Sequence, residues 1–105
     1  MKVQIKENSW VAKMAAAKMK VDKVAIVFGN TIHLHNTNRE EFLQDNDWVC
    51  HELKHVEQYN QNGFAGFIVK YLFDWIKNGY YNNKFEVEAR KSEKDKHLTN
   101  EVEFV

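Results

Sequence analysis

Residues 48–59, WVCHELKHVEQY, contain two histidines four positions apart, and a glutamate directly follows the first of them. The apolar residues of this stretch, Val49, Leu53 and Val56, recur at the spacing of one helix face, so a helix is predicted here. His51 and His55 then share a face, where both imidazoles can reach one zinc ion about 2 Å away. The stretch therefore predicts a helix that carries two ligands of a metal site.

The ends of this helix are marked by residues that typically begin and end helices. It is predicted to run from residue 47 to about residue 60, with Asp45 or Asn46 as its N-cap. Gly63 follows as its stop. Both ends of the predicted helix therefore lie just outside the quoted stretch.

Around the helix, each side chain has a predicted environment. Glu52 lies about 100° from His51, where it can reach a water on the metal more easily than the metal itself. His51, Glu52 and His55 occupy an arc of the helix surface between its apolar stripe and the side opposite that stripe. That opposite side is predicted to face solvent and contains Cys50, Lys54, Glu57, Gln58 and Gln61.

A third ligand is needed, and the sequence offers two candidates. A metzincin would place glycine and then histidine after the second histidine, but Gln58 and Gln61 occupy those positions, so that class is excluded. The remaining common arrangement takes a carboxylate from a later helix. Glu86 and Glu88 in KFEVEAR are the candidates, and one of the two is expected to face solvent.

Before this helix, the sequence predicts one helix and one hairpin. Ser9 is a plausible N-cap for a helix over residues 10–20, in which Trp10, Met14, Ala17 and Val21 recur at helical spacing. Two β-branched runs, residues 23–28 and 31–35, are separated by Gly-Asn, which indicates a β-hairpin. His33 and His35 alternate on the second strand and would face one side of it, where solvent exposure is expected.

The remaining elements are predicted to be helical. Thr37 or Asn38 can cap one or two turns over residues 37–44, and Asn83 can cap a last helix over residues 84–96. A long helix over residues 64–77 is expected to be the centre of the core because its apolar residues follow helical spacing. These residues are Phe64, Phe67, Ile68, Tyr71, Leu72, Trp75 and Ile76. The charged C-terminal end, from residue 90 on, is expected either to fray or to return as a strand.

Composition limits the fold class and the partners. The 105 residues suit a single α+β domain, mainly helical with a small antiparallel sheet. Lys+Arg and Asp+Glu both number 15, so neither nucleic acid nor a membrane surface is an expected partner. The apolar run at residues 64–76 is too short and too charged to span a bilayer, so a cytoplasmic location is expected. The lone Cys50 agrees with a reducing compartment.

Three motifs in order resemble a known family: FGNTIHLHN, WVCHELKHVEQY and GYYNNKFEVEAR, within residues 24–92. HExxH followed by a helix with a glutamate ligand resembles the gluzincin metallopeptidases, with Arg90 where many members have Asp. More closely, the chain resembles the small metallopeptidase domain of unknown function that is often associated with extracellular contractile injection systems. This resemblance implies a minimal zincin-like domain with an HExxH active-site helix.

The resemblance also implies a site and a reaction. Zinc would be held by His51, His55 and Glu86, and Glu52 would be the catalytic base that takes a proton from the zinc-bound water attacking a peptide bond. Tyr80 and Tyr81, directly before the last helix, are candidates for an oxyanion donor, although aromatic packing under a loop is the role more often expected for such residues. The expected partner is a peptide or protein substrate.

Two other functions compete with this hypothesis. The first is a catalytically silent zinc-binding module that recognises a protein partner and gains fold stability from the metal. The second is a helical interaction domain without metal, which displays Trp48, Trp75 or the Tyr80–Tyr81 turn. A large exposed aromatic surface would favour either of these, whereas an open metal position beside a groove would favour the peptidase.

Overall fold

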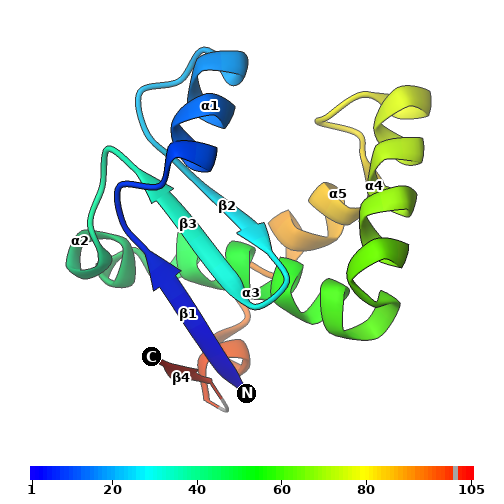
Figure 1. The fold of residues 1–105 in the computed structure, drawn as a ribbon. Helices are drawn as coiled ribbons and strands as arrows, with labels where there is room; N and C mark the ends of the chain where they lie inside the picture. The colour runs from blue at the N-terminus through cyan, green and yellow to red at the C-terminus, as the bar shows by residue number, and fades with distance from the viewer. Residues whose placement is uncertain (101) are drawn as a thin grey trace.

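The computed structural model describes residues 1–100 and 102–105 and has a mainly helical α+β architecture, as predicted (Figure 1). The strands are β1 (Lys2–Lys6), β2 (Val24–Phe28), β3 (Thr31–His35) and β4 (Glu103–Phe104). The helices are α1 (Trp10–Met19), α2 (Arg39–Gln44), α3 (Asn46–Asn62), α4 (Phe64–Asn78) and α5 (Lys84–Lys91), followed by a 3-10 helix, η1 (Lys96–Thr99). None of the described helices is long and apolar enough to cross a membrane.

The sheet is mixed, with the strand order β2-β3-β1-β4. The predicted β2–β3 hairpin is confirmed: Phe28 pairs with Thr31 across a turn in which Gly29 has φ 63°, a value that glycine adopts at little cost. However, β1 lies parallel to both β3 and β4, so the expectation of an antiparallel sheet is only partly correct. Strand β1 was not predicted from the sequence, whereas the two-residue β4 matches the alternative that the charged end returns as a strand.

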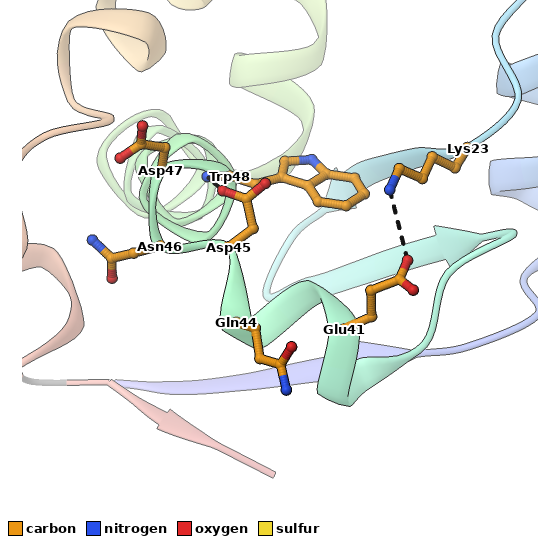
Figure 2. A pocket seen from close by; sticks show the side chains of 7 residues that line it. All are labelled: Lys23, Glu41, Gln44, Asp45, Asn46, Asp47 and Trp48. Atoms are coloured by element: carbon orange, nitrogen blue, oxygen red, sulfur yellow. Dashed lines mark hydrogen bonds and ion pairs between the residues drawn. The ribbon is translucent and has the colours of Figure 1, made fainter.

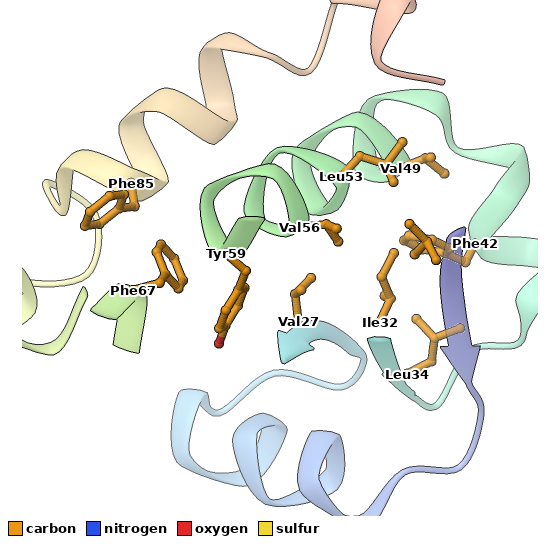
Figure 3. Close-up of a cluster of buried hydrophobic side chains, with 11 residues drawn as sticks. Val27, Ile32, Leu34, Phe42, Val49, Leu53, Val56, Tyr59, Phe67 and Phe85 are labelled. Atoms are coloured by element: carbon orange, nitrogen blue, oxygen red, sulfur yellow. The ribbon is translucent and has the colours of Figure 1, made fainter. Parts of the chain in front are cut away.

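The two faces of the sheet carry different helices. Figure 3 shows α3 on one side of the strands and α1 on the other. Ile32 and Leu34 of β3 are fully buried toward α3, within a cluster that also contains Val27, Phe42, Val49, Leu53, Val56 and Tyr59. His33 lies on the α1 side, where its Nδ1 is 2.9 Å from the hydroxyl of Ser9. The two β3 histidines therefore share a face, as predicted, but this face lies under α1 and away from α3.

Helix α3 is enclosed on more than one side, and this overturns part of its predicted exposure. Cys50 and Gln58 were expected to face solvent, yet both are buried. The Cys50 thiol donates to the Asp95 carbonyl (3.3 Å), and the Gln58 amide donates to the Phe85 carbonyl (3.1 Å). The prediction assumed that only the apolar stripe of this helix is buried, whereas α5 and the segment after it cover a second face of α3 (Figure 1).

Helix α4 has the predicted boundaries to within one residue but not the predicted place in the core. Phe67 is its only buried residue, whereas Phe73 is 70% exposed and Ile76 is 88% exposed. The helix leads away from the end of α3 and lies at the rim of the molecule, so only one face of it is covered (Figure 1). The prediction that α4 is the centre of the core is therefore wrong, and α3 takes that place.

Two other helices differ from their predicted form. In α1 the buried residues are Ala12 and Ala16, while Trp10 and Met14 are exposed, because capping by Ser9 and small side chains bring the helix close to the strands. The last helix ends at Lys91 and not near residue 96. The chain turns at Ser92, and the predicted N-caps Ser9 and Asn83 are both confirmed.

Candidate metal centre

Two histidines from α3 and one glutamate from α5 meet in a single cluster. The Nε2 atoms of His51 and His55 lie 3.1 and 3.2 Å from the same carboxylate oxygen, Oε1 of Glu86. One ligand atom from each of the three residues lies within 4.8 Å of the others. Since α5 packs along α3 and Asn83 fixes its first turn, two distant segments of the chain supply one potential metal site.

The outer nitrogen of each histidine is held by its own acceptor. His51 Nδ1 donates to Glu93 Oε2 (2.8 Å), and His55 Nδ1 donates to Gln58 Oε1 (2.8 Å). The Gln58 amide nitrogen itself donates to two oxygens, which fixes its oxygen toward His55. With a proton on each Nδ1, loss of the proton on Nε2 would leave its lone pair free for a metal ion held beside Glu86, and this is the tautomer that metal-binding histidines usually adopt.

The second oxygen of Glu86 also has a partner. Tyr71 on α4 donates its hydroxyl to Glu86 Oε2 at 2.6 Å. The sequence pattern predicts only that Tyr71 lies on the core face of its helix and does not indicate this hydrogen bond. The available signal was that a phenol on a buried face needs a hydrogen-bond partner. Glu93, in a charged segment without periodicity, offered no comparable signal.

The donor set is of the kind that binds zinc, and two of its three spacings are close to those of a zinc site. Zinc sites commonly combine imidazole nitrogens with a carboxylate oxygen, each about 2.0–2.2 Å from the metal. Ligand atoms at those distances in a tetrahedron are about 3.3–3.5 Å apart, close to the 3.1 and 3.2 Å between Glu86 Oε1 and the two nitrogens. Three protein ligands leave a fourth position, as in catalytic zinc sites.

Without metal, protons hold this cluster together. Burial by itself would lower the pKa of His51, but the hydrogen bonds and charges of Glu86, Glu52 and Glu93 outweigh it and raise this pKa to about 9. Burial favours a neutral Glu86, yet the hydrogen bonds from both histidines hold its pKa well below the usual range. Protons on Nε2 thus occupy the space that a cation would take.

Glu52 lies beside the cluster and is not part of it. Its side chain is buried, and burial raises its pKa to about 7 despite the opposing charges of His55 and His51. A carboxyl group with a pKa near neutrality can both accept and release a proton.

A groove of about 560 Å³ opens onto His51 and Glu52. Its other walls come from the end of α1, β2 and the start of α3, with Tyr80 before α5 and Glu93 after it, and they include Met19, Val21, Val24, Ala25 and Trp48. A neighbouring hollow shares Lys23, Asp45, Asp47 and Trp48 with it and contains the Lys23–Glu41 ion pair at 3.7 Å (Figure 2). This hollow is not lined by any of the three potential metal ligands.

The other residues singled out in the sequence take separate places. Tyr80 lines the groove, and burial together with the charge of Glu86 raises its pKa, so its phenol stays protonated. Tyr81 is 70% exposed and stacks on the Arg90 guanidinium, 4.0 Å from its ring centre. Glu88 lies outside the cluster and accepts from Gln58 at 2.9 Å. Of the two candidate carboxylates, Glu86 is in the cluster and Glu88 is outside it, and of the two tyrosines, Tyr80 lines the groove and Tyr81 lies at the surface.

A comparison with protein-family models shows to which family this chain belongs. The model of the eCIS core domain matches residues 1–63, more than half of the chain, so the chain belongs to this family, which is associated with extracellular contractile injection systems. The matched segment runs from β1 through α3 and includes His51, Glu52 and His55, whereas Glu86 lies beyond it. No curated protein and no solved structure matches the chain.

Proposed function

We propose that this member of the eCIS core domain family is a zinc-dependent metallopeptidase, with His51, His55 and Glu86 as zinc ligands and Glu52 as general base. The observation that carries the proposal is the approach of both Nε2 atoms to one oxygen of Glu86, with Glu52 next to them at the groove. A purely structural zinc site has no need of such a carboxyl group. Zinc bound here would make a water molecule more acidic and polarise the substrate carbonyl.

The residues around the ligands have separable roles in this mechanism. Glu52 accepts a proton from the attacking water and delivers it to the leaving amine, a task suited to its pKa of about 7. Tyr80 lines the same groove as a protonated phenol and can donate to the oxygen on which negative charge develops. We give Tyr81 no role, because it stacks on Arg90 at the surface.

The substrate would lie along the edge of the sheet. Among the described strands β2 is at one end of the order β2-β3-β1-β4, and its residues Val24 and Ala25 line the groove. A strand edge can pair with an extended peptide through main-chain hydrogen bonds. A peptide bound in this way crosses the groove in front of His51 and Glu52.

The test compares wild type with Glu52→Gln, both loaded with zinc. A library of unmodified peptides is incubated with each protein, and new termini are counted by mass spectrometry. The expected result is that Glu52→Gln binds zinc normally but loses about 10²- to 10⁴-fold in cleavage rate, the contribution typical of a general base. Glu57→Gln is the matched control, because Glu57 is on the same helix and pairs with Lys54 (2.8 Å) away from the groove. Full activity of zinc-loaded Glu52→Gln would refute the mechanism.

The second candidate function is a catalytically silent zinc-binding module that recognises a protein. The observation in its favour is the exposed apolar face of α4, where Val69 is 66%, Phe73 70% and Ile76 88% exposed. Contiguous apolar surface of this kind often marks an interaction site. Zinc binding by wild type without any cleavage of the library would favour this function over the peptidase.

A further inference from the structure

The two carboxylate oxygens of Glu86 have different partners, because the hydroxyl of Tyr71 bonds to one of them and the two histidines contact the other. Oε2 accepts from Tyr71 at 2.6 Å, while Oε1 lies 3.1 and 3.2 Å from the histidine nitrogens. The terminal torsion of a glutamate side chain is broad, so the carboxylate has no strong preference of its own for this orientation. Tyr71 therefore supplies a constraint that the glutamate lacks.

Tyr71 is itself fixed relative to the helix that carries Glu86. Its backbone carbonyl accepts from the side chain of Asn83 (3.0 Å), and the Asn83 side-chain oxygen caps α5 by accepting from the Phe85 amide (2.9 Å). Asn83 is fully buried, and its two hydrogen bonds join α4 to the first turn of α5. The ring of Tyr71 also stacks on Phe85 with centroids 6.3 Å apart. The phenol thus reaches Glu86 from a rigid position.

We propose that Tyr71 is a positioning residue that makes Glu86 bind the metal through Oε1 alone. This inference rests on the metal-binding part of the proposed function. A carboxylate free of Tyr71 can rotate or present both oxygens to the metal, which raises the coordination number and occupies the position needed for water. Partners that orient metal ligands in this way typically contribute 10- to 100-fold to metal affinity.

The test measures metal binding by wild type and Tyr71→Phe, both purified without a histidine tag. This substitution removes the hydroxyl and keeps the ring and the carbonyl that Asn83 uses. Zinc affinity is measured by competition with a chelator, and cobalt(II) is then bound in place of zinc, because its visible absorption distinguishes four-coordinate from higher-coordinate sites. The matched control is Tyr59→Phe, since Tyr59 on α3 also packs its ring against Phe67, with centroids 4.4 Å apart, and its hydroxyl has no hydrogen-bond partner among the described residues.

Tyr71→Phe is expected to weaken zinc binding by about 10- to 100-fold and to lower the cobalt absorption, while Tyr59→Phe behaves as wild type. Zinc affinity of Tyr71→Phe within twofold of wild type would overturn the proposal and leave the proposed function in place. An equal loss in Tyr59→Phe would also overturn it, because general loosening of the core would then be the cause. If wild type binds no zinc, the proposed function itself fails.

Discussion

Glu86 and Glu88 differ by two positions in the chain, and the structure separates them completely. Glu86 is buried against both histidines, whereas Glu88 is near the surface with Gln58 and Lys54. Glu86→Ala should therefore lose bound zinc, and Glu88→Ala should retain one equivalent. Elemental analysis of protein purified without a histidine tag measures this difference. Zinc retained by Glu86→Ala and lost by Glu88→Ala would mean that the carboxylates have been assigned in reverse.

A second prediction at this scale concerns the proton on His51 in the metal-free protein. The pKa of His51 is about 9 in the fold, compared with an ordinary value of 6.5, because Glu86, Glu52 and Glu93 outweigh its burial. The folded state therefore holds this proton more tightly than the unfolded state does. Its contribution to stability is fully present below pH 6.5 and is lost as the pH rises through about 9.

Urea denaturation in the presence of a chelator tests this prediction. The urea concentration at the unfolding midpoint of wild type should decrease as the pH is raised from about 6.5 to 9. The decrease should be smaller for His51→Gln. His35→Gln on the opposite side of the sheet is the control and should fall as wild type does. A wild-type midpoint that stays constant over this range would contradict the prediction.

At the scale of elements, the starts of helices were predictable from sequence, whereas the end of α5 and the burial of the helices were not. Capping side chains act locally, so Ser9 and Asn83 were predicted correctly as N-caps, and Asn38 and Asp45 proved to be the caps among the two candidates offered for each of their helices. Burial depends on which neighbours cover a helix, and a single helical wheel cannot show a second covering layer. For this reason the less apolar α3 lies at the centre and the more apolar α4 at the rim.

Two leucines on these helices give a direct test of this reversal. Leu53 on α3 is 1% exposed, and Leu72 on α4 is 48% exposed. Leu53→Ala should lower the free energy of unfolding by about 2–5 kcal/mol, because it leaves a cavity in the core. Leu72→Ala should change it by only about 0.5 kcal/mol, as most surface substitutions do. Chemical denaturation of both variants measures this difference, and a larger loss for Leu72→Ala would contradict the assigned positions of α3 and α4.

At the scale of the whole molecule, the site depends on contacts between segments that are far apart in the chain. His51 and His55 were recognisable by spacing within one helix, but Glu93 and Tyr71 reach the site only through the packing of the segment after α5 and of α4. Local patterns contain no information on such contacts. The motif therefore predicted His51 and His55 of the cluster, and the family resemblance pointed to Glu86, while the residues that hydrogen-bond to them came only from the structure.

The same long-range geometry predicts that zinc stabilises the whole fold. The ligands join α3 to α5, and in the unfolded chain these segments have no fixed spacing, so zinc binds mainly the native state. A free zinc concentration a hundredfold above Kd should add about 2.7 kcal/mol to stability. For a domain of this size the gain corresponds to a rise in Tm of roughly 10–20 °C.

Thermal denaturation with zinc, with a chelator and with magnesium measures this effect. Zinc should raise Tm for wild type and not for Glu86→Ala, because that variant lacks the carboxylate that connects the two helices. Magnesium should have little effect, since it prefers oxygen ligands and the site offers two imidazole nitrogens. If zinc raised Tm equally in wild type and Glu86→Ala, the metal would be bound elsewhere, and α5 would have no part in holding it.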